Sequence, residues 1–485
     1  MSKYYTIIGL EIHAELNTNS KMFCGCLNDP DEKTPNVNIC PVCMAHPGTL
    51  PVINKKAVEN VIRVGLAIDA NIADFTEFDR KNYFYPDIPK NYQISQYKNP
   101  IVSGGKLKGV DITRVHLEED TATSKHPERK ITSYGAGDND AYSLVDFNRA
   151  GVPLTELVTE PVIHSAKQAG DFGRELQLLL RYLGVSEANM EKGQMRVELN
   201  ISISEDPKKL GTKVEVKNIN SFRAMERAAE YEIKRMTDLL ESGRGNEIVQ
   251  ETRGWDENKQ LTFSQRSKEN ANDYRYFPDP DLPKLFLSKV FDIEKMRIEL
   301  PELPEAKRNR YRNDYGIKDE DIESYIVDQG LGSWFERVAS ILKDKELIKL
   351  ASNYITNDLL GVLHSFPMDQ EALELTSQYF SKLMIMLKEN RISSRGAKDI
   401  LPIIFSENIN DPEIIAQEKG LIQNHDEGAL KEIVQKIIDA NPNVVATYKG
   451  GKENAIMSLV GQVMKESKGS ANPGLVQKIL KELLN

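Results

Sequence analysis

The sequence lacks long apolar runs and any signal-like segment. No apolar stretch among its 485 residues approaches the roughly 20 residues that a membrane-spanning helix needs, so we expect no membrane partner. Met1 to Tyr5 lead directly into a strand-like pattern, which predicts a cytoplasmic protein without a signal peptide. A hydrophobic content of 40% with 28% charged residues is typical of a water-soluble protein with substantial cores.

Two common nucleotide-binding motifs are also missing. The sequence contains neither the pattern Gly-x4-Gly-Lys-Ser/Thr nor a Gly-x-Gly-x-x-Gly that opens a helix after a strand. Any ATP site must therefore be of another type. The net charge of −10 argues against indiscriminate nucleic-acid binding, although a local basic surface could still dock a folded RNA.

Cysteines are few, and all four lie in one short region. They form a Cys-x-Cys and a Cys-x-x-Cys pair, consisting of Cys24, Cys26, Cys40 and Cys43. In a cytosolic protein such pairs are typical of a tetrahedral zinc site rather than of disulfides. We expect a structural Zn²⁺ ion that fixes the intervening loop; the alternative is four clustered, reduced cysteines. If all four bind metal, none is left to act as a nucleophile.

The stretch from Ile8 to Leu16 alternates between apolar and polar residues, which predicts a half-buried strand. Its polar face carries Glu11, His13 and Glu15. Residues two apart on one face of a strand lie roughly 6.5 to 7 Å from each other, so two carboxylates and an imidazole project together. Taken alone, the stretch could equally be a solvated strand face.

Three further segments repeat this design. The first, Ile112 to Asp120, ends in three acids that could bind a divalent cation or form a solvated strand end. The other two carry carboxylates beside basic residues, namely Glu198 beside Arg196, and Glu215 beside Lys213 and Lys217. One-sided strands of this kind usually form antiparallel sheets. If the strands that carry Glu11, Glu198 and Glu215 are neighbours, they form an acidic patch of Glu11, Glu15, Glu198 and Glu215 with His13. Such carboxylates suit Mg²⁺, and Mg²⁺ beside Lys and Arg suits a nucleoside triphosphate.

The chain changes character along its length. Residues 79–93 combine basic residues, aromatics and prolines, and either line a ligand site or pack onto the core. Helical periodicity replaces strand alternation after about residue 293. We therefore predict an α+β fold with an antiparallel-sheet domain at 1–293, an all-α domain at 294–407 and a small α-helical tail at 408–485.

The tail is locally basic in an acidic protein. Residues 447–485 contain six lysines and three glutamates. Four of these lysines lie on or near glycine-bearing turns that could follow an RNA backbone, and they are Lys449, Lys452, Lys465 and Lys468. A soluble helical surface explains the same residues.

Five ordered motifs together resemble the B subunit of the three-subunit tRNA-dependent amidotransferases, which convert glutamyl-tRNA(Gln) or aspartyl-tRNA(Asn) to the amide form. The motifs are Ile8–His13, Asp79–Asp87, His116–Asp120, Glu215–Phe222 and Asp273–Pro278. The resemblance covers essentially the whole chain. It implies an N-terminal cradle domain that uses ATP and Mg²⁺ to phosphorylate the misacylated side chain, a helical domain and a tail that contacts tRNA.

The resemblance also implies roles for particular residues. The implied catalytic residues are Glu11, His13, Glu118, Glu119 and Glu215. The implied Mg²⁺ ligands are these five residues and also Glu198, which stands where many members of the family carry Asp. The implied ATP and phosphate contacts are Lys81, Arg149 and Lys217. The four cysteines resemble those of the zinc-bearing members.

The implied enzyme is a carbon–nitrogen ligase that takes its amide nitrogen from glutamine. The chain has no cysteine outside the predicted zinc site and no Gly-Ser-Ser-rich amidase signature. The resemblance therefore implies a partner amidase, the A subunit, that acts as the glutaminase. It also implies the small C subunit. A two-subunit archaeal relative would carry an inserted domain, for which this chain has no room. The chain could instead be a protein of another class, a non-catalytic tRNA-binding adaptor. The retained carboxylates argue against this alternative.

Overall fold

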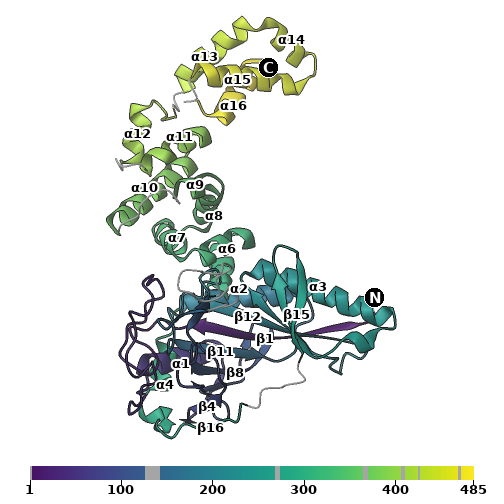
Figure 1. The fold of residues 1–485 in the computed structure, drawn as a ribbon. Coiled ribbons are helices and arrows are strands. Elements are labelled where there is room, and N and C mark those ends of the chain that lie inside the picture. The colour runs from purple at the N-terminus through teal and green to yellow at the C-terminus, as the bar shows by residue number, and fades with distance from the viewer. Residues whose placement is uncertain are drawn as a thin grey trace, which may run out of the picture. The chain divides into compact units, whose positions relative to one another are not determined.

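The computed structural model describes residues 3–125, 143–267, 274–363, 370–405, 410–423, 427–467 and 471–484. The chain forms two compact units, Met1–Leu303 and Pro304–Asn485. The first is built on β-sheet with helices and the second is helical, which confirms the α+β class (Figure 1). The predicted division of the helical part near residue 407 falls outside the described residues and stays a prediction.

A ten-stranded sheet organises the described part of the first unit. Its strand order is β15-β14-β13-β12-β1-β11-β8-β6-β2, with β7 paired to β8. The strands are β1 (Tyr5–Glu15), β2 (Asn71–Ile72), β6 (Val102–Ser103), β7 (Lys106–Leu107), β8 (Val110–Glu119), β11 (Pro153–Thr159), β12 (Met195–Ser204), β13 (Val214–Ile219), β14 (Glu251–Asp256) and β15 (Leu261–Ser267). Every pair is antiparallel except β13 with β14. The predicted antiparallel sheet is therefore confirmed, with one parallel exception.

Strand β1 lies between β11 and β12, in the middle of this sheet (Figure 1). The predicted alternation is confirmed, because the apolar residues Ile8, Leu10, Ile12, Ala14 and Leu16 are all buried in the core. Their burial fixes the register, since a slip of one residue would turn the charged side chains into the core.

Three helices cover the apolar side of the sheet, and they are α1 (Lys55–Ala67), α2 (Ala166–Tyr182) and α3 (Phe222–Glu241). Asn54, Ser165 and Ser221 cap them, because each side chain accepts hydrogen bonds from backbone N–H groups of the first turn. With the helices on the apolar side, the opposite, charged face is left to form a site.

A small sheet lies against the long one near β8. It has the order β16-β4-β5, with β4 (Asp79–Asn82), β5 (Tyr92–Ser95) and β16 (Phe277–Pro278). Arg80 of β4 fixes the segment after β16, because its Nε donates to Asp279 Oδ2 and its Nη2 donates to Asp281 Oδ2, both at 2.8 Å. The short pairs β9 (Thr123–Lys125) with β10 (Leu144–Asp146), and β3 (Phe75–Thr76) with β17 (Leu285–Phe286), complete the described strands.

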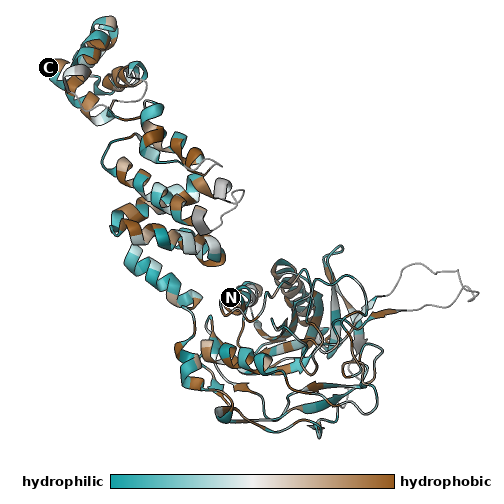
Figure 2. Cartoon of the chain, turned by 90° about the vertical axis from the view of Figure 1, so that its left-hand side faces the viewer, coloured by the Kyte–Doolittle hydropathy of each residue, from teal (hydrophilic) through white to brown (hydrophobic). Residues whose placement is uncertain are grey.

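Helix α4 (Ile293–Ile298) closes the first unit, and the described part of the second is helical. Its helices are α5 (Pro304–Arg310), α6 (Asp319–Val327), α7 (Gln329–Leu342), α8 (Lys345–Tyr354), α9 (Leu360–Leu363), α10 (Gln370–Lys388), α11 (Ser394–Ile404), α12 (Pro412–Glu418), α13 (Glu427–Ala440), α14 (Pro442–Lys449), α15 (Ile456–Glu466) and α16 (Pro473–Leu484). Hydrophobic and hydrophilic residues are interspersed along the helices of this unit (Figure 2). Residues from α13, α15 and α16 share one apolar core. In the part of the chain that is described, no helix is long and apolar enough to span a bilayer.

Candidate functional site: an acidic cavity and a cysteine cluster

A row of ionisable residues crosses the charged face of the sheet. The strand register places His116, Glu156, His13 and Arg196 side by side on β8, β11, β1 and β12. Directly opposed side chains of antiparallel strands come within contact distance. The Nε2 atom of His13 accordingly lies 3.4 Å from Glu156 Oε2, 3.5 Å from Glu118 Oε1 and 4.0 Å from Glu11 Oε1.

A second set of acids continues this face across β12 and β13. Glu11 lies directly opposite Glu198, and Glu215 lies one strand further, opposite Asn200. The ammonium group of Lys217 bridges the two outer acids at 2.9 Å from each, on Glu198 Oε1 and Glu215 Oε1. Thr252 of β14 donates to Glu215 Oε2 at 3.2 Å. Strands β1, β12 and β13 are therefore neighbours, as predicted, whereas β11 separates β8 from β1.

The pKa shifts indicate a strong negative field on this face. Burial lowers the pKa of His13, but the hydrogen bond to Glu156 and the charges of Glu118 and Glu156 raise it to about 9. Burial and the nearby Glu11 raise the pKa of Glu198 to about 6, against the opposing charge of Lys217. Burial raises the pKa of Glu156, yet the two histidines hold it well below its usual range. Such a set of carboxylates is stabilised by a cation.

Most of these residues line one cavity with a volume of about 490 Å³, namely Glu11, His13, His116, Glu156, Glu198, Glu215 and Lys217, whereas Glu118 is buried beside His13 and is not part of the lining. The cavity is also lined by Lys81 of β4 and by three tyrosines, Tyr97, Tyr274 and Tyr276. The ammonium group of Lys81 lies 5.1 Å from the ring centre of Tyr274. Burial lowers the pKa of Lys81, but Glu118 and other groups raise it above the ordinary value, so Lys81 stays charged.

Carboxylate and imidazole groups could hold a divalent cation at two places in this cluster. The atoms of Glu11, His13 and Glu156 that could ligate a metal lie within 4.8 Å of one another, and so do those of His116, Glu118 and Glu156. Oxygen-rich sites of this kind suit Mg²⁺, which keeps several waters and takes few protein carboxylates. The side chains present therefore fit Mg²⁺.

The structure brings together most of the residues predicted for this site. The acidic cluster and its cavity contain Glu11, His13, Glu118, Glu198, Glu215, Lys81 and Lys217. It does not bring in Glu119 or Arg149.

Glu119 lies on the other face of β8 from Glu118, because successive side chains of a strand point to opposite faces. Its Oε2 atom accepts a hydrogen bond from Lys90 at 2.6 Å, and its Oε1 atom accepts one from the backbone N–H of Ile94 at 2.9 Å. The expectation that it joins the acidic cluster is corrected: Glu119 forms a separate, buried ion pair.

Arg149 is part of a separate group near the end of β1. Its guanidinium donates to the carbonyl oxygens of Thr121 and Ala122, and its Nε lies 3.6 Å from Asp120 Oδ2. Asp120 also accepts from Arg196 at 2.8 Å. Glu15 joins this group, as its interactions with Asp120 and Arg149 indicate. The predicted phosphate role of Arg149 and the predicted place of Glu15 in the acidic patch are therefore not supported by these contacts.

Two central residues, Glu156 and His116, were not predicted as site residues. Glu156 contacts both histidines, since Glu156 Oε2 lies 3.4 Å from the Nε2 atoms of His13 and His116. A sequence signal existed, because Glu156 sits among apolar residues in the stretch Leu154 to Val158. A carboxylate at such a position is buried at a cost unless it is paired. His116, two residues before Glu118, shares its face of the strand.

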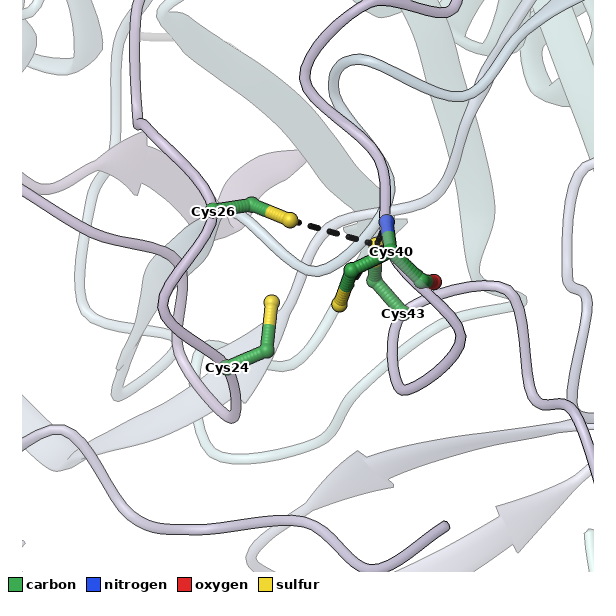
Figure 3. Close-up of side chains that lie close together, drawn as sticks. All are labelled: Cys24, Cys26, Cys40 and Cys43. Carbon is green, nitrogen blue, oxygen red and sulfur yellow. Dashed lines mark hydrogen bonds between the residues drawn. The ribbon is translucent and has the colours of Figure 1, made fainter.

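The four cysteine side chains converge on one point (Figure 3). All four Sγ atoms lie within 4.8 Å of one another, and Cys43 Sγ lies 3.9 Å from that of Cys40 and 4.0 Å from that of Cys26. A tetrahedral zinc with Zn–S bonds of about 2.3 Å places its sulfurs about 3.8 Å apart, whereas a disulfide needs about 2.05 Å. The cluster therefore fits a four-thiolate zinc site and not disulfides.

The thiol pKa values agree with a site that needs a cation. The hydrogen bond from Cys24, and further the charge of Lys21, lower the pKa of Cys43 to about 4. Burial and the interactions with Cys40 and Cys43 raise that of Cys26 to about 12. Without a metal, the thiolate of Cys43 therefore disfavours ionisation of a second thiol.

The predicted tail lysines lie at the surface of the second unit. Lys449 ends α14, Lys452 follows it and Lys465 lies in α15, and all three are exposed. Lys468 lies outside the described residues.

Comparisons with known proteins agree with this architecture. Residues 6–291 match the family model of the GatB/GatE catalytic domain, and residues 333–484 match that of the GatB domain. Named relatives include the B subunits of the aspartyl/glutamyl-tRNA(Asn/Gln) amidotransferases of Carboxydothermus hydrogenoformans, with 42% identity over 100% of this chain and 99% of the relative, and of Moorella thermoacetica, with 44% identity over 99% and 100%. The corresponding protein of Thermotoga maritima is 43% identical over 99% of both chains.

The matched domains place the chain among the components of tRNA-dependent amidotransferases, which are glutamine-dependent carbon–nitrogen ligases. The chain belongs to the family of B subunits of the aspartyl/glutamyl-tRNA(Asn/Gln) amidotransferases.

Proposed function

We propose that this chain uses ATP to phosphorylate the side-chain carboxylate of glutamyl-tRNA(Gln), aspartyl-tRNA(Asn) or both, so that ammonia can convert the acid to the amide. The observation that supports this is one cavity that is lined both by acids, Glu11, Glu156, Glu198 and Glu215, and by Lys81 and Lys217. This arrangement suits a nucleoside triphosphate, which brings many negative charges and a divalent cation with it.

Activation is needed because a carboxylate is a poor electrophile. Its negative charge repels a nucleophile, and its oxygens are poor leaving groups, whereas an acyl phosphate carries a good one. Lys81 and Lys217, which both line the cavity, would hold the phosphate oxygens of ATP and offset the charge that develops on them. Catalysis of phosphoryl transfer rests mainly on such positioning and charge stabilisation.

The residues that would hold Mg²⁺ are those of the acidic cluster: Glu11, His13, Glu118, Glu156, Glu198 and Glu215. The convergence of Glu11, His13, Glu118 and Glu156 supports the assignment, and Glu119 and Arg149 have no part in it because their contacts lie elsewhere. When bound, the cation would neutralise charge on the transferred phosphoryl group. Lys217 would offset part of the negative charge of Glu198 and Glu215, with which it forms ion pairs.

Ammonia would come from a partner. Each cysteine of the chain belongs to the cysteine cluster, which leaves no thiol nucleophile for releasing ammonia from glutamine. A glutaminase as the A subunit and a small C subunit would complete the enzyme, as the lettered names of the relatives suggest. The cysteine cluster would carry a structural zinc ion, and the lysines of the tail would contact tRNA.

The test is ADP release by the chain purified with its co-expressed partners, measured with Mg²⁺ and ATP, with and without glutamyl-tRNA(Gln). Glu11→Gln removes one carboxylate charge from the cluster. The matched control is Glu205→Gln, at a residue that directly follows β12 and forms an ion pair with Lys3. Release that requires charged tRNA and is lost only in Glu11→Gln would support the proposal. Release unchanged in Glu11→Gln would favour the tRNA-binding adaptor.

A further inference from the structure

Two tyrosines from distant parts of the sequence stack at the wall of the acidic cavity. The rings of Tyr97 and Tyr276 lie 4.4 Å apart between centroids, with an angle of 11° between their planes. Both residues line the cavity, yet Tyr97 is 60% exposed. Tyr276 stacks on one face of Tyr97, and the large exposed fraction of Tyr97 leaves surface for a further planar group.

The backbone holds this stack in place from both sides. Tyr97 follows β5, Tyr276 precedes β16, and both strands pair with β4. Buried Asp79, at the start of β4, accepts a hydrogen bond from the backbone N–H of Tyr97 at 2.9 Å. The stack is therefore pre-formed, and a ligand need not order it on binding.

The stack continues toward the phosphate-binding side of the cavity. Tyr276 makes an edge-to-face contact with Tyr274 at 6.1 Å, and the ring of Tyr274 lies 5.1 Å from the ammonium group of Lys81. A nucleotide has the same order of parts, because a flat base is joined through a sugar to phosphates. The exposed stack and the lysine thus provide for both ends of one ligand.

A purely structural role explains the stack less well. A tyrosine that only supports the core buries its ring, as Tyr311 and Tyr325 of the second unit do. Tyr97 leaves most of its surface in water beside a charged cavity. Exposed aromatic rings of this kind bind nucleic-acid bases by stacking, with each base contributing about 1–3 kcal/mol.

We infer that the Tyr97–Tyr276 stack is a platform for an adenine ring. This inference rests on the proposed function, which supplies two sources of adenine: ATP itself and the 3′-terminal adenosine of the charged tRNA. Both place a carbonyl or phosphoryl group near the acidic cluster while the base lies on the platform. The platform would recognise the base of the ligand, whereas the other proposed residues of the site bind Mg²⁺ and phosphate groups.

The experiment compares Tyr97→Ala with Tyr97→Phe in the complex purified with its partners. Three quantities are measured with Mg²⁺: the Kd of ATP without tRNA, the Kd of inorganic tripolyphosphate, and the KM of glutamyl-tRNA(Gln) at saturating ATP. If ATP supplies the base, Tyr97→Ala raises the Kd of ATP by about 5- to 150-fold. The Kd of tripolyphosphate, which has no base, stays unchanged. Tyr97→Phe keeps the ring and binds ATP as the wild type does.

If the tRNA end supplies the base, Tyr97→Ala leaves the Kd of ATP unchanged and raises the KM of glutamyl-tRNA(Gln). Tyr5→Ala, which removes another exposed ring at the far start of β1, should change none of these values. The inference is overturned if Tyr97→Ala changes neither value, or if Tyr97→Phe weakens binding as much as Tyr97→Ala. A wild-type complex that releases no ADP would overturn the proposed function, and this inference with it.

Discussion

Glu118 and Glu119 are adjacent in sequence, but they lie on opposite faces of β8 and have different partners. Glu118 Oε1 lies 3.5 Å from His13 Nε2 in the acidic cluster, whereas Glu119 Oε2 accepts a hydrogen bond from Lys90 at 2.6 Å. The strand geometry alone enforces this separation. Two acids that look equivalent in the motif His116–Asp120 therefore belong to different parts of the protein.

The first prediction concerns this pair. Glu118→Gln should abolish ADP release, because it removes a charge from the cluster that faces His13 and Lys81. Glu119→Gln should leave the Kd of MgATP within about twofold and instead lower the free energy of unfolding by about 1–3 kcal/mol, since a charged buried hydrogen bond is lost. The ADP assay is run on both variants, and calorimetric titration with MgATP and urea denaturation measure the two effects expected for Glu119→Gln. Equal loss of ADP release in both variants would contradict this division.

The second prediction concerns Glu156, which contacts both histidines. Glu156→Gln should reduce ADP release by at least about 100-fold, the scale of losing one charge-stabilising group, while tRNA affinity changes little. Glu160→Gln, at an exposed position just after the same strand, is the control. Because Glu156 is buried, thermal denaturation should accompany the assay. ADP release within about threefold of the wild type would show that Glu156 is dispensable.

How far the sequence predicted this site can be judged from Glu11 and Glu156. The alternation around Glu11 is clean, so its face and its neighbour Glu198 followed once the strands were assumed adjacent. Strand β11, which carries Glu156, is buried on both faces, and its pattern Leu154-Thr155-Glu156-Leu157 shows no simple alternation. Its position between β1 and β8 is a property of the topology, which local periodicity does not encode.

The helices were predictable for a local reason, and the aromatic loops were not. Asn54 and Ser221 are of residue types that favour the N-cap and stand next to regular apolar spacing, and both cap helices. For residues 79–93, cavity lining and core packing stayed open. The structure shows both, because Lys81 lines the cavity whereas Ile88 is buried in the interior.

The third prediction concerns the cysteine cluster. Purified protein should contain about one zinc ion per chain, the stoichiometry of a single four-thiolate site. Cys43→Ser should lose the metal and lower the melting temperature by at least about 5 °C, because metal binding stabilises only the folded loop. Val37→Ser, an exposed substitution in the same loop, is the control. Zinc content is read by atomic emission and stability by thermal denaturation. A wild-type protein that contains no zinc and melts at the same temperature as Cys43→Ser would refute a structural zinc.

The fourth prediction concerns the tail, where deletion is a poor test. Removing residues from 447 onward would cut away α15 and α16 and expose the core residues Leu430 and Val434 of α13. Substitution of the exposed lysines Lys449, Lys452 and Lys465 by Ala leaves that core intact. If each contacts a phosphate, tRNA affinity should fall, and the slope of log K against log salt should become shallower by about two to three units.

The matched control replaces three lysines of the first unit, Lys56, Lys167 and Lys192, each of which is paired with an acid. Both triple variants lose three positive charges, so a general effect of net charge would weaken binding equally in the two. Filter binding of glutamyl-tRNA(Gln) between about 50 mM and about 200 mM salt, the range over which phosphate contacts weaken strongly, separates them. If the tail contacts tRNA, the slope of log K against log salt becomes shallower only in the variant with the three tail substitutions. An unchanged slope there would mean that the tail lysines form an ordinary solvated surface.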